Sequence, residues 1–233
     1  MKLKHALKTV LPVLLAVLAI HAHATPISVV SYDMPNGDSF LPYHDNTYNG
    51  SGDPNVPNAP LSGSTGQLTD GSLGTSVAPS EPSGFYEYVL WHNVLPTVIF
   101  DFGAAWDVDQ ISLHIFRLDP AAVHIPVNVD VSFSDDKINF GLVTSFTMTG
   151  SEVADRSSGW IDLSVTGTGR YLQLLLNNNG YHLAVDEIAF DGTQSPSTSV
   201  PDAGPGALMT ALVLFGCCAW CAKRHATKLT HPM

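Results

Sequence analysis

The stretch PVNVDVSFS at 126–134 decides the fold class of this chain. Its three valines and Phe133 alternate with single polar residues, which is the two-residue period of a strand that buries one face. The stretch ISLHI at 111–115 shows the same alternation. Both stretches therefore predict strands whose apolar sides pack against a common core.

Short runs rich in Val, Ile, Leu, Phe and Tyr fill the middle of the chain, and turn-forming residues separate most of them. These runs are Pro26–Asp33, Thr97–Gly103, Asp109–Phe116, Pro126–Ser134, Phe140–Met148, Gly159–Val165, Arg170–Leu176 and Ala184–Asp191. This middle region has no apolar stripe of helical period. We therefore expect an all-β, antiparallel jelly-roll β-sandwich over 25–193. Pro35–Ser83 is rich in Gly, Pro, Asn and Ser and is expected to form turns across one end of it.

The N-terminal segment Met1–Ala24 has a basic start, an apolar run and a small-x-small exit, AHA. This layout is typical of a secretory signal peptide that is cleaved after Ala24. An uncleaved N-terminal anchor is the alternative, and the apolar run is short for spanning a bilayer. The segment therefore predicts export.

The C-terminal segment Gly206–Ala222 is apolar and uncharged, and Lys223 and Arg224 follow it. At about 1.5 Å per residue, a helix of this length nearly crosses a bilayer. The basic residues predict a cytoplasmic tail at 223–233. We expect a linker at 194–205 and a transmembrane helix at 206–222; a buried core helix is the alternative.

The region from Thr25 to Val200 contains 20 acidic and four basic residues, which leaves a formal charge of −16. Nucleic acid and anionic lipid surfaces are therefore unfavourable partners, and cations or neutral ligands are better ones. Acidity also serves solubility alone. The three cysteines lie in the apolar C-terminal segment, so no disulfide is expected in the domain.

Catalytic motifs are absent from the sequence: it contains no G-x-S-x-G, no H-E-x-x-H and no phosphate-binding glycine loop. Carboxylates are numerous, but no pair among them stands out as a general acid and base. We expect a protein that is not an enzyme, with a polysaccharide hydrolase as the alternative that remains open.

The loop LTDGSLGT at 68–75 has the composition of a tight oxygen-rich turn. Asp70 offers a carboxylate and Thr75 a hydroxyl, and small residues let backbone carbonyls turn inward. Calcium is bound by six to eight such oxygens. Asp-Gly is equally a plain turn signal, so both interpretations stand.

Several motifs together resemble the discoidin, or coagulation factor 5/8 type C, domain of the galactose-binding-like fold. They are the Thr-Asp-Gly loop, the aromatic segment ending at Trp91, VIFDFG at 98–103 and DEIAF at 186–190. The similarity extends from Ile27 to Gly192. It implies a structural calcium ion that joins the loop to the last strand. The implied ligands are the side chains of Asp70, Thr75 and Glu187, with backbone carbonyls near Leu68 and Leu73.

The resemblance also implies a sugar site at the loop end of the sandwich, where lectins of this family use His and Arg. Arg117 follows the strand at 111–116, and His124 precedes the next strand. His92 and the aromatic Trp91 are further candidates for ligand contact. Each of these four residues is alternatively an ordinary surface side chain.

The C-terminal VPDAG at 200–204, followed by an apolar span and Lys223-Arg224, resembles PEP-CTERM sorting signals in a Val-Pro-Asp variant. Such signals imply processing by an exosortase-type membrane enzyme in Gram-negative bacteria that secrete polysaccharide. The motif lacks the usual Glu-Pro, and the chain continues for nine residues after Arg224. A plain single-pass anchor is therefore the alternative.

Together these features predict a non-catalytic protein that binds carbohydrate within extracellular polysaccharide. We expect an exported precursor anchored in the inner membrane, and then a location at the cell surface or in the extracellular matrix. The alternative is a structural or adhesion protein whose sandwich contacts another protein and has no sugar site.

Overall fold

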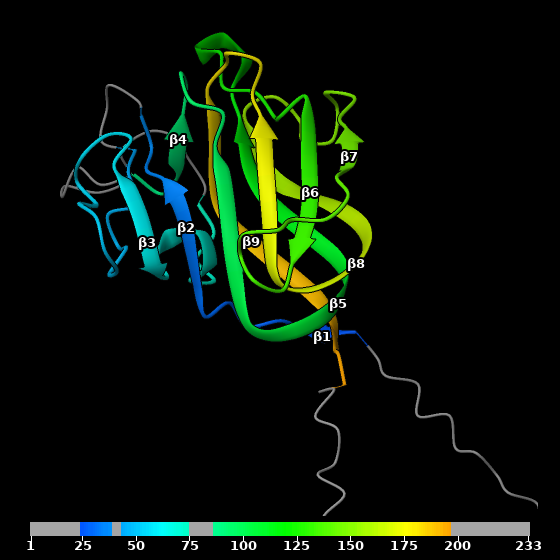
Figure 1. Cartoon of the computed structure of the whole chain (residues 1–233). Coiled ribbons are helices and arrows are strands. Elements are labelled where there is room, and N and C mark those ends of the chain that lie inside the picture. The colour runs from blue at the N-terminus through cyan, green and yellow to red at the C-terminus, as the bar shows by residue number, and fades with distance from the viewer. Residues whose placement is uncertain (1–23, 39–42, 75–85, 197–233) are drawn as a thin grey trace, which may run out of the picture. The chain divides into compact units, whose positions relative to one another are not determined.

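The computed structural model describes residues 24–38, 43–74 and 86–196. These residues form strands and two short 3-10 turns, and every pair of strands is antiparallel (Figure 1). The strands are β1 (Thr25–Pro26), β2 (Ser31–Pro35), β3 (Pro60–Ser64), β4 (Val89–Trp91), β5 (Thr97–Arg117), β6 (Asn128–Ser134), β7 (Thr144–Thr147), β8 (Ser157–Asn177) and β9 (Leu183–Gln194). The 3-10 turns are η1 (Gln67–Thr69) and η2 (Asp119–Ala121). The expected all-β antiparallel architecture is confirmed.

Two long strands replace four of the expected short ones. The runs at 97–103 and 109–116 are parts of β5, and the runs at 159–165 and 170–176 are parts of β8. The pairing of β5 with β8 shifts register between Asp101 and Trp106. A bulge of this kind bends a strand while the ladder continues on both sides, which the local sequence pattern does not reveal.

The bends divide the strands into two layers that share β5 and β8 (Figure 1). In one layer the order is β3-β2-β5-β8-β6-β7, and in the other it is β1-β9-β5-β8 with β4 beside β9. Phe100 of the first layer meets Phe190 of the second edge to face, with ring centroids 4.8 Å apart. Apolar side chains of both layers therefore enclose one core.

The expected strands at the two ends of the domain are shorter in the structure. Pro26–Asp33 divides into β1 and β2, and only Thr144–Thr147 of the run at 140–148 is a strand. The region expected to form only turns, Pro35–Ser83, contains β3 and η1 in its described part. Its polar composition hides β3, which pairs with β2 by backbone hydrogen bonds.

The loop before β3 is tied to the sandwich through a buried carboxylate. Asp45 accepts a hydrogen bond from the Tyr32 hydroxyl and another, 2.9 Å long, from the Gln67 backbone N–H. The Tyr48 hydroxyl donates to the Tyr32 carbonyl at 2.6 Å. Burial raises the pKa of Asp45, against the effect of these donors.

The expected signal peptide, sorting motif and transmembrane helix fall on 1–23 and 197–233, outside the described residues, and they stay predictions. Within 24–38, 43–74 and 86–196, we find no helix with the length and apolar character needed to cross a bilayer.

Candidate functional site

A pocket of about 230 Å³ lies where several strands end. It is lined by segments at the end of β5, before β6, after β7 and before β9. The lining residues are Arg117, His124, Ile125, Pro126, Val127, Met148, Thr149, Gly150 and Tyr181. The structure thus brings together Arg117 and His124, two of the residues singled out in the sequence.

The Arg117 guanidinium is held by neighbouring loops. Its Nε and Nη2 donate to the two carboxylate oxygens of Asp119, at 2.7 and 2.8 Å. Its Nη1 donates to the carbonyl of Val153, at 2.9 Å, and to that of Gly150. Four of the five guanidinium N–H groups are therefore used, and Arg117 fixes the wall of the pocket. The hydrogen bonds from Arg117 lower the pKa of Asp119.

His124 and Tyr181 add an aromatic and polar surface to the pocket. Their rings meet edge to face, with centroids 4.3 Å apart, and the Tyr181 side chain is 44% exposed. His124 Nδ1 lies 3.3 Å from Asp119 Oδ1. The His124 backbone N–H donates to the His182 carbonyl at 2.8 Å, which fixes the two segments against each other.

The structure does not place Trp91 or His92 at this pocket. Trp91 is fully buried in the core, and its indole N–H donates to the Pro35 carbonyl at 2.8 Å. The prediction that Trp91 contacts a ligand is therefore wrong, because no face of its ring reaches solvent. His92 stacks on His182 with ring centroids 4.1 Å apart and is absent from the pocket lining.

Seven of the nine lining residues were not identified from the sequence, among them Tyr181 and Met148. Tyr181 follows the run NNNG at 177–180, which marks a turn but gives no sign that the next ring lines a pocket. Met148 ends an expected strand and has no distinguishing pattern. Asp119, which neutralises Arg117, is two residues from it in a Leu-Asp-Pro turn that resembles many others.

The Thr-Asp-Gly loop lies against β9, as the resemblance implied. The Gly71 N–H donates to Glu187 Oε2 at 2.9 Å, and the Gly74 N–H donates to Asp186. Asp70 accepts from the Ser72 N–H at 2.7 Å. Leu68 is buried and Leu73 is exposed, while Thr75 lies outside the described residues.

The carboxylates beside this loop are short of positive charge. Burial raises the pKa of Glu187 to about 7, and the nearby charges of Asp70 and Asp186 add to the effect. Asp186 is paired with His114, whose Nδ1 lies 2.7 Å from Asp186 Oδ1. In the part of the chain that the structure describes, His, Cys, Asp and Glu side chains form no metal-binding group of three.

Comparison with known proteins places the chain in a family. The family described as discoidin domain-containing receptor 1/2, DS-like domain, matches residues 28–192. No curated protein matches the chain.

Three solved structures resemble the chain at 14% identity. The CBM32 of AlyQ, in complex with 4,5-unsaturated mannuronic acid, covers 71% of this chain and 97% of its own, with a TM-score of 0.43. A fucolectin from striped bass (Morone saxatilis) serum covers 76% and 52%, with a TM-score of 0.41. CpGH89CBM32-5 from Clostridium perfringens, in complex with GalNAc-β-1,3-galactose, covers 45% and 76%, with a TM-score of 0.34. The match over 28–192 shows that the chain belongs to the DS-like domain family of discoidin domain-containing receptors 1 and 2.

Proposed function

We propose that this protein is a non-catalytic carbohydrate-binding module with a jelly-roll β-sandwich, and that the pocket at the end of β5 is its sugar-binding site. The observation that carries the proposal is the meeting of the exposed Tyr181 ring with His124 and the Arg117 wall in one cavity. Aromatic faces suit the apolar side of a pyranose, and planar donors suit its hydroxyls.

The volume and composition of the pocket suit one sugar residue. About 230 Å³ is below the roughly 300–1,000 Å³ of sites for drug-sized ligands, so the pocket fits a terminal or side-chain sugar of a polysaccharide. Tyr181 would pack against the ring, while His124 and Thr149 exchange hydrogen bonds with its hydroxyls. Binding is equilibrium recognition, and no bond of the ligand is made or broken.

A glycan array with the full-length protein, kept in a detergent without a sugar headgroup, tests this proposal. We expect saturable binding that Tyr181→Ala or His124→Ala weakens about tenfold, equivalent to ~1.4 kcal/mol. Trp160→Ala is the matched control, because Trp160 is 40% exposed and is not part of the pocket lining. An array without hits, or equal losses in all three variants, contradicts the proposal.

Adhesion through protein contact is the second candidate function, and one observation favours it. The loop between β6 and β7 exposes Ile138, Leu142 and Val143, whose exposed fractions are 81%, 96% and 61%. Neighbouring apolar side chains at a surface are frequent in protein contacts. A blank glycan array together with a protein partner whose binding depends on Leu142 would support this candidate instead.

We also propose a structural calcium ion between the Thr-Asp-Gly loop and β9. The donor set fits a hard cation, because Asp70 and Glu187 supply carboxylate oxygens and the small-residue loop supplies carbonyls at Leu68 and Leu73. The raised pKa of Glu187 supports the proposal, because it marks a buried carboxylate that a cation would stabilise in its ionised form. The hydroxyl of Thr75 completes the proposed set.

Removal of calcium is expected to lower the melting temperature of the protein by several degrees, because a ligand bound only by the folded state stabilises it. Thermal unfolding with excess calcium and with a chelator measures the difference. Asp70→Ala should abolish most of this calcium-dependent difference in melting temperature. Asp135→Ala, at an exposed loop position, should leave the difference unchanged. A wild-type protein that melts identically in both conditions carries no such ion.

For the segments at the chain ends, we propose export and sorting. The layout of Met1–Ala24 supports secretion, and the VPDAG motif with its apolar span supports an inner-membrane precursor processed by an exosortase-type enzyme. The mature protein would then lie at the cell surface or in the extracellular polysaccharide that it binds.

A further inference from the structure

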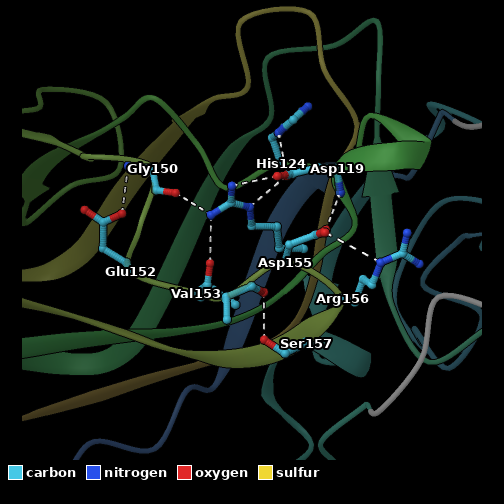
Figure 2. Close-up of polar contacts among 10 residues, drawn as sticks. Asp119, His124, Gly150, Glu152, Val153, Asp155, Arg156 and Ser157 are labelled. Carbon is cyan, nitrogen blue, oxygen red and sulfur yellow. Dashed lines mark hydrogen bonds and ion pairs between the residues drawn. The ribbon is translucent and has the colours of Figure 1, made fainter.

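Three acidic side chains lie next to Arg117 of the pocket wall, although none of them is among the residues that line the pocket. Asp119, Glu152 and Asp155 surround the Arg117 guanidinium, and each of the three adds to the stability of its charged form. In Figure 2, Asp119 lies beside His124, Asp155 is joined to Arg156, and Glu152 lies next to Gly150. The arrangement determines which electrical charge the pocket can accept.

Each carboxylate is held in place by hydrogen bonds. Both oxygens of Asp119 accept from Arg117, and its backbone N–H donates to Asp155 Oδ1 at 2.8 Å. Glu152 accepts from the backbone N–H groups of Thr149 and Gly150, at 2.6 and 3.0 Å. These hydrogen bonds hold the three negative charges close to Arg117 and to the loop at 149–150.

The binding edge of Arg117 is already occupied. A carboxylate or sulfate is recognised best by two parallel N–H groups of a guanidinium. In Arg117 the Nε–Nη2 edge holds Asp119, and both N–H groups of Nη1 hold loop carbonyls. Arg156 is the other arginine near these carboxylates. Its Nε lies 3.6 Å from Asp155 Oδ2, and its side chain is 67% exposed.

From this geometry we infer that the pocket selects neutral sugars and rejects carboxylated or sulfated ones, and that Asp119 is the residue that sets this specificity. The inference rests on the proposed carbohydrate-binding function and names the ligand class of the same site. An anionic sugar would have to displace Asp119 from Arg117, or bind next to three carboxylates that outnumber the two arginines beside them. The formal charge of −16 between Thr25 and Val200 opposes such a ligand from a distance as well.

The test compares neutral glycans with their charged counterparts on the full-length protein. Homogalacturonan as its methyl ester and as the free acid is one matched pair, and a neutral galactan with its sulfated form is another. We expect array hits among neutral glycans, with each charged counterpart bound at least roughly tenfold more weakly at low salt. Added NaCl should strengthen binding of the charged form, because it screens repulsion.

The Asp119→Asn variant should change this preference. It keeps the shape of the side chain and frees the charge of Arg117, so affinity for the charged glycans should rise roughly five- to tenfold relative to the neutral ones. Asp135→Asn is the matched control, because it removes the same charge at an exposed position, whereas Asp119 is hydrogen-bonded to Arg117 of the pocket lining. The melting temperature of each variant confirms that it is folded.

The outcomes separate this inference from the proposed function. A wild-type protein that binds a charged glycan as tightly as its neutral counterpart contradicts the specificity, although it still binds carbohydrate. The same conclusion follows if Asp135→Asn shifts the preference as much as Asp119→Asn. An array with no hits of either kind removes the proposed function and this inference together. If Asp119→Asn does not fold, the salt dependence of the wild-type protein still tests whether the pocket rejects charged glycans.

Discussion

Replacement of Asp45 by alanine is expected to lower the free energy of unfolding by about 4 kcal/mol. Asp45 is fully buried and accepts hydrogen bonds from the Tyr32 hydroxyl and the Gln67 backbone N–H. Alanine leaves both buried donors unpaired, and each unpaired donor costs about 1–3 kcal/mol. The variant therefore loses a large part of the stability of an ordinary domain.

Urea unfolding of the full-length protein measures this effect as a lower transition midpoint. Asp53→Ala is the matched control in the same loop region. Asp53 is exposed and accepts the Asn55 N–H at 2.9 Å, so its loss should cost less than about 1 kcal/mol. Similar midpoints for Asp45→Ala and Asp53→Ala would show that the buried carboxylate does not hold the loop against β2.

Trp91→Ala should cost a similar amount, about 3–5 kcal/mol, because it empties a fully buried site in the core. It also removes the indole donor of the Pro35 carbonyl. Glycan affinity of the folded fraction should stay unchanged, because Trp91 does not line the pocket. Unfolding curves and titrations of the same preparation measure both quantities.

Trp160→Ala tests whether the loss of stability in Trp91→Ala comes from the burial of the side chain or only from its size. Trp160 is 40% exposed, so its removal should destabilise the protein much less than Trp91→Ala. A Trp91→Ala protein of nearly wild-type stability that no longer binds glycan would reverse the assignment and return Trp91 to the ligand site.

The sequence alone determined the all-β fold class and indicated that one loop lies near the last strand. Alternation in PVNVDVSFS reports which side of a strand is apolar, and the structure confirms it with Val129 and Val131 in the core. The family resemblance implied a calcium ion between the Thr-Asp-Gly loop and the last strand, and the two segments do meet, because the Gly71 N–H donates to Glu187. These features are local patterns or short family motifs, so a single sequence is sufficient to find them.

Other features depended on contacts between distant parts of the chain. Trp91 is in the core because β2 and β9 lie beside it, and its hydrogen bond to Pro35 joins residues 56 positions apart. Tyr181 reaches the pocket because the His182 backbone binds the segment at 122–124.

The charge state of the pocket was likewise decided by tertiary structure. Arg117 and His124 were identified from their places beside strands, but the sequence does not show which donors of Arg117 remain for a ligand. That depends on the loop at 150–153, which the fold brings to Arg117 from more than 30 residues away. Sequence periodicity describes the side of a strand on which a residue lies, whereas burial and free hydrogen-bonding capacity depend on what the completed fold places against that side.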